Sequence, residues 1–309
     1  MKILLTGAAG QLGQALRTAA PSDATIIATS RQGGGGLEAL DLGDANACRM
    51  AVETHRPDWV LNAGAYTAVD KAESEPELAH AVNAMGPRAF AEALKTSGGR
   101  LLQISTDFVF NGSQGTPYRP EQNRTPLGVY GASKAAGEDA IQEVFAGDAR
   151  ALILRTSWVM GPVGRNFALT MLRLHQERDT LGVVADQVGC PSSTLNLAQA
   201  CWQCIRLGST QGLPEIMHWS DSGAASWYDV AVAIGELGSE LGLLPSPAEV
   251  NPISTSDYPT PADRPSYSLL DCKGTREALQ LNGEHWRRAL RTVLRNSAQT
   301  ATTPPSSHP

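Results

Sequence analysis

The sequence predicts an α/β fold in which a doubly wound parallel sheet is followed by a smaller C-terminal lobe. In the first half of the chain, short aliphatic and β-branched runs alternate with longer helical patterns, as in sheets whose parallel strands are joined by crossover helices. A glycine-rich loop directly follows the first of these runs. After Gly208 the composition changes to glycine- and proline-rich loops around two further helical patterns.

The expected strands and helices of the sheet follow one another in regular alternation. The short apolar runs expected to be strands are Lys2–Thr6, Thr25–Ala28, Trp59–Leu61, Leu101–Ser105 and Leu152–Leu154. The longer segments expected to be helices are Gln11–Thr18, Ala45–His55, Glu77–Thr96 and Ala132–Phe145. A further run, Gly182–Ala185, precedes a helical pattern at Leu195–Arg206, so we expect it to extend the same sheet.

The rest of the chain is expected to form the smaller lobe and a tail. Prolines 245, 247, 252, 259, 261 and 265 prevent long regular elements, and helices are expected at Ala225–Leu241 and Asn282–Arg295. We assign residues 1–158 and about 181–210 to the sheet domain, and about 159–180 and 211–296 to the lobe. Residues 297–309 are rich in Ser, Thr and Pro and are expected to be disordered.

Composition excludes several classes of protein. Lys and Arg number 25 against 31 Asp and Glu, and the net charge of −6 disfavours nucleic acid as a partner. No run reaches the roughly 18 apolar residues of a membrane span, and the N-terminus lacks the features of a signal peptide. We therefore expect a soluble, cytoplasmic protein. The 5 cysteines are scattered, which argues against a disulfide framework. Cys201-x-x-Cys204 lies in a helical run and is interpreted as helix packing, and no spacing predicts a metal site.

The glycine-rich loop has the context of a dinucleotide-binding site. Gly7, Gly10 and Gly13 lie between the first strand and the first helix. In such a loop the first glycine permits a tight turn, the second lets a pyrophosphate approach the backbone, and the third lets helix and strand pack closely. The spacing is one residue wider at the front than the G-x-G-x-x-G form. A purely structural glycine turn is the alternative.

The end of the second strand bears on the choice of cofactor. An acidic residue there would bind the ribose 2′-hydroxyl of NAD, but the sequence has Ser30 and Arg31. Arg31 can meet a 2′-phosphate, so NADPH is favoured over NADH, and an exposed loop arginine is the alternative. Asp41 and Leu42 follow at the distance expected of a segment that borders an adenine ring.

A tyrosine and a lysine are spaced for acid–base chemistry. Tyr130 and Lys134 are four residues apart, which places them on one face of a helix. A nearby ammonium favours the phenolate, so we expect Lys134 to lower the pKa of Tyr130 from about 10. Thr106 follows the fourth strand, and ligands of open parallel sheets lie beyond the carboxyl ends of their strands. Asn62–Ala65 ends the third strand at the same edge.

These motifs together resemble the extended short-chain dehydrogenase/reductase family. The residues that carry the resemblance are T-G-x-x-G-x-x-G, D-L-x-D, N-x-G-A, the threonine and Y-x-x-x-K. NAGAYTAVDKAE (62–73), STDFVFNG (105–112) and LRTSWV (154–159) are similar to a narrower group, the dTDP-4-dehydrorhamnose reductases. Asp186-Gln187, Arg264-Pro265 and Trp286 also fit this group, so the resemblance spans nearly the whole chain except the tail.

The resemblance implies a function and a set of site residues. The implied reaction is reduction of the C4 keto group of dTDP-4-dehydrorhamnose by NADPH or NADH, to give dTDP-L-rhamnose. The implied catalytic residues are Thr106, Tyr130 and Lys134. The cofactor would be bound by Gly7, Gly10, Gln11, Leu12, Gly13, Ser30, Arg31, Asp41, Leu42, Ala63, Ala65, Tyr66, Thr67, Tyr130 and Lys134. The substrate would be bound by Val69, Thr106, Asp107, Tyr130, Trp158 and Arg264.

Each substrate residue has a structural alternative. Trp158 can be a core residue, Val69 a packed aliphatic and Asp107 a turn cap. Arg264 is assigned to the substrate pyrophosphate only because of its charge and its position in the smaller lobe. A surface salt bridge is an equally good explanation for this arginine.

Some relatives bind magnesium between subunits through acidic residues, but the aligned positions here are Ala15 and Leu195. Metal-linked dimerisation is therefore doubtful, and both a monomer and a homodimer remain open. The alternative functions are another nucleotide-sugar 4-keto reductase, an epimerase, and a non-catalytic dinucleotide-binding regulatory subunit. The last would be expected to lose part of the catalytic group.

Overall fold

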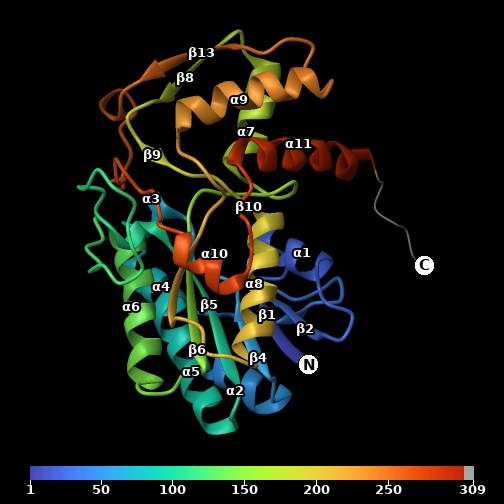
Figure 1. Cartoon of the computed structure of the whole chain (residues 1–309), viewed down its shortest axis with the longest axis vertical. Coiled ribbons are helices and arrows are strands. Elements are labelled where there is room, and N and C mark those ends of the chain that lie inside the picture. Colours follow the sequence, from blue (N-terminus) through green and yellow to red (C-terminus); the bar gives the residue numbers. More distant parts are fainter. Residues whose placement is uncertain (303–309) are drawn as a thin grey trace.

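A parallel sheet of 7 strands forms the centre of the computed structural model, which describes residues 1–302 (Figure 1). The strand order is β11-β6-β5-β4-β1-β2-β3, and every pairing is parallel. The order reverses direction between β1 and β4, which creates a crevice at the carboxyl ends of these strands. The strands are β1 (Lys2–Thr6), β2 (Thr25–Ser30), β3 (Glu38–Ala39), β4 (Trp59–Asn62), β5 (Arg100–Thr106), β6 (Ala151–Thr156) and β11 (Ile216–Trp219).

Helices cover both faces of this sheet, because alternate residues of its strands are apolar on both sides. Ile3 and Leu5 of β1 join one buried cluster and Leu4 joins the other. The first face is covered by α1 (Gln11–Thr18), α8 (Thr194–Gly208) and α10 (Lys273–Leu279). The second is covered by α2 (Ala45–His55), α5 (Gly86–Ser97) and α6 (Val129–Val144). Short helical segments precede α5 and α6: α3 (Val69–Ala72), α4 (Pro76–His80), the π-helical η1 (Ala81–Met85) and the 3₁₀ turn η2 (Asp107–Val109).

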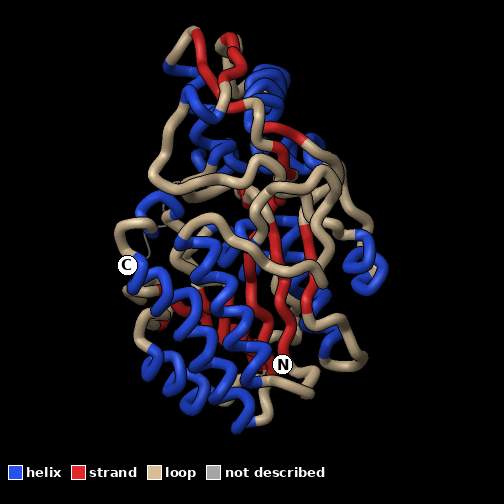
Figure 2. The backbone as a smooth tube through the Cα atoms, turned by 90° about the vertical axis from the view of Figure 1, so that its left-hand side faces the viewer, coloured by secondary structure: helices blue, strands red, loops and turns tan. Residues whose placement is uncertain are grey.

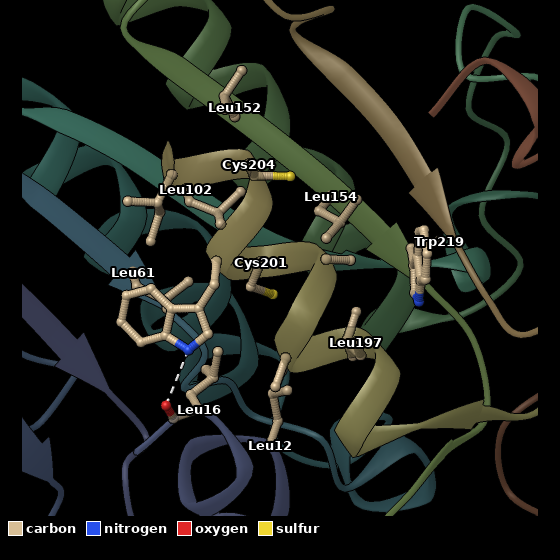
Figure 3. Packing of buried hydrophobic residues seen from close by; sticks show 14 of the residues in the cluster. Leu12, Leu16, Leu61, Leu102, Leu152, Leu154, Leu197, Cys201, Cys204 and Trp219 are labelled. Carbon is tan, nitrogen blue, oxygen red and sulfur yellow. Dashed lines mark hydrogen bonds between the residues drawn. The ribbon is translucent and has the colours of Figure 1, made fainter. Parts of the chain in front are cut away.

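The cysteine pair on α8 belongs to the core (Figure 3). Cys201 and Cys204 are fully buried together with Leu197, and burial raises the pKa of both thiols. Trp202 on the same helix donates from Nε1 to the carbonyl oxygen of Leu16 at 3.1 Å, which ties α8 to α1. The pair therefore packs the helix against the sheet.

A second group of elements lies beyond the carboxyl ends of the strands (Figures 1 and 2). It has its own buried cluster, with members from α7 (Phe167–Glu177), α9 (Trp227–Glu240) and α11 (Trp286–Thr302). β8 (Thr180–Val184) pairs with β13 (Glu249–Ile253) in a small parallel sheet. The remaining elements are β7 (Val159–Met160), which pairs with β10 (Ser192–Ser193), β9 (Val188–Gly189), which pairs with β12 (Ala225–Ser226), and η3 (Thr255–Asp257).

The predicted α/β fold is confirmed. The helix expected at Glu77–Thr96 is also present, because α4, η1 and α5 follow one another without a break from Pro76 to Ser97. Two local expectations are wrong. The run at 182–185 forms β8 in the second group of elements, and β11 extends the main sheet instead. Of the expected disordered tail, residues 297–302 belong to α11, and the rest lies outside the described residues.

The division of the chain into two domains stays a proposal. We propose that the boundary follows the buried clusters, because β11 and α10 pack with the sheet and β8 packs with α9. In the part of the chain that the structure describes, no helix is long and apolar enough to cross a membrane.

Candidate active site

Polar side chains tie together the carboxyl ends of the central strands. The Thr6 hydroxyl donates to Asn62 Oδ1 at 2.5 Å, and Asn62 Nδ2 donates to Gln103 Oε1 at 2.7 Å. The backbone N–H of Gly64 donates to the same threonine oxygen at 3.0 Å. All three side chains are buried, so they fix the ends of β1, β4 and β5 at the crevice.

The loop after β1 is shaped for close approach of a phosphate. Gly7 has φ +64, a conformation that favours glycine. A Cβ on Gly13 would lie 2.2 Å from the Gly7 carbonyl oxygen, so only glycine permits this packing of α1 against the loop. No side chain of residues 1–302 caps the N-terminus of α1 at Gly10. The first N–H groups of the helix can therefore bind an anion, and the residues present fit the pyrophosphate of a dinucleotide.

Most of the residues expected from the sequence line one cavity of about 740 Å³. It runs from the glycine loop to the ends of β5 and β6 and reaches the second group of elements. The expected residues that line it are Gly7, Gly10, Gln11, Leu12, Gly13, Ser30, Arg31, Ala63, Ala65, Thr67, Val69, Thr106, Asp107, Tyr130, Lys134, Trp158 and Arg264. Asp41, Leu42 and Tyr66 are not among the lining residues.

These three residues support the loops around the cavity. Asp41 accepts from Arg31 Nε at 3.2 Å, which holds the arginine at the end of β2. The Leu42 side chain lies so near Gly64 that a Cβ there would meet its Cδ1 at 2.6 Å. The Tyr66 hydroxyl donates to Glu75 Oε2 at 2.8 Å.

An asparagine in the π-helical segment links the loop after β4 to α6. Asn83 is buried, and its side chain accepts from the backbone N–H of Tyr66 at 2.9 Å and donates to its carbonyl at 3.0 Å. The same amide donates to the Ser133 hydroxyl at 3.0 Å, and Ser133 donates to the Tyr130 carbonyl at 2.8 Å. Asn83 therefore fixes the loop relative to the helix that carries Tyr130.

Lys134 lies on α6 one turn after Tyr130 and is almost fully buried. Its Nζ donates to the carbonyl oxygen of Ile104 at 2.7 Å, which anchors the ammonium at the end of β5. Burial lowers the pKa of Lys134 to about 8, and the carboxylate of Glu138, one turn further on, opposes this shift.

The pKa of Tyr130 differs from the expectation. Burial of the ring raises it to about 12, a hydrogen bond with Thr106 acts in the opposite direction, and the nearby Asp107 raises it further. The prediction that Lys134 sets an acidic phenol is therefore wrong for this geometry, because desolvation of the phenolate dominates. The hydroxyl is protonated at neutral pH, which makes it a proton donor.

Thr106 and Asp107 stand at the end of β5. The Thr106 hydroxyl donates to Asp107 Oδ1 at 3.1 Å and accepts from the backbone N–H of Phe108 at 3.2 Å. Asp107 is buried, and burial raises its pKa to about 6, although the Ser268 hydroxyl lowers it. Its Oδ2 has no geometrically acceptable hydrogen-bond partner in residues 1–302.

Two tryptophans form the side of the cavity towards the second group of elements. Trp158 has φ +47, and its ring stacks on Trp227 with 3.6 Å between the centroids. Both rings line the cavity and also a neighbouring one of about 510 Å³, which lies among α7, β8 and the loop before Arg264. Trp158 therefore stands where the two cavities meet.

Arg264 is bound to a carboxylate from the sheet domain. Its Nη2 donates to Asp70 Oδ2 at 2.8 Å, and Nη1 donates to the Ala262 carbonyl at 3.0 Å. The ion pair that the sequence left open as an alternative is present, and the guanidinium also lines both cavities.

A buried charged cluster joins α6 to β5 and β6. Glu138 of α6 is fully buried and accepts three hydrogen bonds from Arg155 of β6, at 2.9, 3.2 and 2.6 Å. It also accepts from Ser105 at 2.5 Å and from Arg124 at 3.2 Å. Arg155 Nη1 in turn contacts His218 Nε2 at 3.2 Å. The cluster fixes α6 against β5 and β6.

Trp227, Asn83 and Glu138 are absent from the sequence-based site. Each acts through partners that are distant in the sequence, so no local spacing marks them. Of the three, only Glu138 could have been found from the sequence, because it follows Lys134 by four residues, as Lys134 follows Tyr130. Within the described residues, no group of three His, Cys, Asp or Glu side chains is placed to hold a metal ion.

Comparison with known proteins decides the family. Residues 1–299 match the family described as the RmlD substrate binding domain. The chain belongs to this family. The resemblance drawn from the sequence motifs is thus confirmed, and the chain is an oxidoreductase with an extended short-chain dehydrogenase/reductase fold.

Relatives of this family match almost the whole chain. A dTDP-4-dehydrorhamnose reductase from Salmonella typhimurium is 38% identical over 315 residues, which is 98% of this chain and 100% of the relative. A solved dTDP-4-dehydrorhamnose reductase from Clostridium acetobutylicum superposes with a TM-score of 0.85 at 34% identity and covers 95% of this chain and 98% of its own. The Bacillus anthracis reductase, solved in complex with NADP, has a TM-score of 0.82 at 33% identity, with 94% and 98% covered.

Proposed function

We propose that the enzyme reduces the C4 keto group of dTDP-4-dehydrorhamnose to give dTDP-L-rhamnose, with NADPH as the reductant. The observation that carries this proposal is one cavity that holds the glycine loop, Thr106, Tyr130 and Lys134 together. The full-length relatives with this activity, and the NADP bound to one of them, support both the substrate and the cofactor.

Tyr130 is proposed as the proton donor of the reaction. When bound, NADPH supplies a hydride to C4 of the sugar. The Tyr130 hydroxyl gives its proton to the carbonyl oxygen, and the raised pKa of about 12 keeps that proton in place before the reaction. The Thr106 hydroxyl, which donates to Asp107 before substrate binds, is proposed to turn and donate to the same carbonyl, which polarises it. Solvent then returns a proton to Tyr130.

Lys134 is proposed to hold the nicotinamide ribose and to favour the phenolate as it forms. Its ammonium is fixed by the Ile104 carbonyl and is held close to the phenol by the helix. A fixed cation stabilises negative charge that develops in a desolvated site. The lysine thus acts on the charge formed during the reaction, while the resting phenol stays protonated.

The sugar is proposed to lie between Trp158 and the end of β5, beside Val69. Asp107, which lines the cavity beside Thr106, is proposed to accept from a sugar hydroxyl. The neighbouring cavity takes the nucleotide, and Arg264 faces its pyrophosphate. Ser30 and Arg31 lie where the adenosine ribose is expected, so we propose that Arg31 favours NADPH by meeting the 2′-phosphate.

A turnover assay tests this proposal. Purified enzyme is mixed with NADPH and enzymatically prepared dTDP-4-dehydrorhamnose, NADPH oxidation is followed at 340 nm, and the product is identified by mass spectrometry and NMR. We expect stoichiometric formation of dTDP-L-rhamnose. NADPH oxidation with a different 4-keto sugar but not with this one would overturn the substrate assignment, and absence of turnover with all of them would overturn the enzymatic role.

A further inference from the structure

We propose that Arg165, in the loop between β7 and α7, binds the pyrophosphate of the nicotinamide dinucleotide. The proposal rests on the cofactor site of the proposed function and adds a ligand from outside the glycine loop. Arg165 belongs to none of the sequence motifs that predicted the site.

The loop that carries Arg165 is fixed against the first turn of α1. Asn166 Nδ2 donates to Gln11 Oε1 at 3.1 Å and to the Gly161 carbonyl at 2.8 Å, and its Oδ1 accepts from the N–H of Leu169 at 3.1 Å. Gln11 Nε2 donates to the Val159 carbonyl at 3.1 Å. The neighbour of Arg165 thus joins the start of α7 to the first residue of α1.

The loop also lies close to the phosphate end of the cavity. A Cβ built on Gly164 would be 3.7 Å from the Gln11 side chain, and Gly164, Arg165 and Asn166 line the same cavity as Gly10 and Gln11. The loop that carries Arg165 therefore lies beside the N-terminus of α1, to which the glycine loop brings the pyrophosphate.

The charge of Arg165 is available for an anion. The other lining arginines are paired, Arg31 with Asp41 at 3.2 Å and Arg264 with Asp70 at 2.8 Å. Lys134 is anchored to a backbone carbonyl. Arg165 has an exposed side chain and forms no ion pair with a carboxylate of residues 1–302. An unpaired guanidinium beside a helix N-terminus suits a phosphate, which it can bind through two parallel hydrogen bonds.

Position distinguishes the pyrophosphate from the 2′-phosphate. Arg31 follows β2 and Arg165 adjoins Gln11, so the two arginines serve different ends of the dinucleotide. The pyrophosphate is common to NAD and NADP. Arg165 should therefore strengthen binding of both, whereas Arg31 should strengthen binding of NADP alone.

Calorimetric titration with NADP⁺ and with NAD⁺ tests this assignment without any sugar substrate. We expect Arg165→Ala to raise both dissociation constants about tenfold, the lower end for a hydrogen bond to a charged group, and to leave their ratio unchanged. Arg165→Lys keeps the charge without the planar fork and should give a smaller rise. Arg31→Ala should raise the NADP⁺ constant alone. Arg17→Ala removes an equal charge at the other end of α1 and is the matched control, with both constants unchanged.

Other outcomes would overturn the assignment. If Arg165→Ala had the same dissociation constants as the wild type, Arg165 would not bind the pyrophosphate. A rise for NADP⁺ only would move it to the 2′-phosphate. If the wild-type protein bound neither dinucleotide, the proposed function itself would fail, which is distinguishable from failure of the arginine assignment.

Discussion

His218 should make the fold sensitive to acid. It is fully buried on β11, its Nδ1 lies 3.0 Å from the Tyr118 carbonyl, and its Nε2 faces Arg155. The carbonyl fixes the proton on Nδ1, so Nε2 accepts from the arginine. Burial lowers the pKa of His218 to about 3, and the Arg155 charge lowers it further, whereas the carbonyl opposes both. Protonation would place two cations side by side.

The size of the effect follows from this pKa. The unfolded chain binds a proton on this histidine below pH 6.5, whereas the folded chain does not until about pH 3. A folded pKa below the unfolded one means that stability is complete above pH 6.5 and is lost as the pH falls towards 3. At pH 5 the loss is about 2 kcal/mol. His218→Gln keeps one donor and one acceptor but does not titrate.

Urea denaturation of both proteins at pH 7.5 and pH 5 measures this loss. We expect the free energy of unfolding of the wild type, relative to His218→Gln, to fall by about 2 kcal/mol between the two pH values. Other titrating groups are common to both proteins and cancel in the difference. A difference that is the same at both pH values would refute a buried neutral His218.

Further predictions concern the active site. Because burial lowers the pKa of Lys134 to about 8, its charge is lost above that pH, and the NADP⁺ dissociation constant should rise there. A constant value up to pH 10 would contradict the lowered pKa of Lys134. Trp227→Ala should raise KM for the nucleotide sugar about tenfold and leave NADP⁺ binding unchanged, and an unchanged KM would contradict the role of the stacked pair. Gly13→Ala forces a methyl group against the Gly7 carbonyl and should abolish NADP⁺ binding in calorimetry. Gly274→Ala is the control, because a methyl group there meets no atom of residues 1–302 within 4 Å, and this variant should bind NADP⁺ normally. Equal binding by both variants would refute the packing argument.

The sequence predicts the parts of the fold whose hydrophobic pattern is regular. The expected Gln11–Thr18 and Ala45–His55 coincide with α1 and α2. Strand pairing is harder to predict, because the sequence of a short apolar strand does not indicate which strand lies beside it. For this reason β8 was expected in the main sheet, whereas it pairs with β13, about 70 residues further along the chain. Nor does any local residue signal mark the π-helical segment before α5.

The candidate site, like the fold, was predicted only in part. Thr106, Tyr130 and Lys134 were predicted because spacing and strand ends bring them together, and they line one cavity. Their roles remain proposals. The direction of the Tyr130 pKa shift was predicted wrongly, because burial of the phenol is the largest cause and the charge of Asp107 adds to it, and the four-residue spacing indicates neither. Asn83 and Trp227 depend on contacts across the fold and were missed.

The central claim is that the Tyr130 hydroxyl supplies the proton that completes reduction at C4. Pre-steady-state turnover of Tyr130→Phe with saturating NADPH and dTDP-4-dehydrorhamnose tests it most directly, with the NADP⁺ dissociation constant measured on the same preparation. We predict a rate lower by about 10²–10⁴ with unchanged dinucleotide affinity, as for loss of a general acid. A rate within a few-fold of the wild type would contradict the claim.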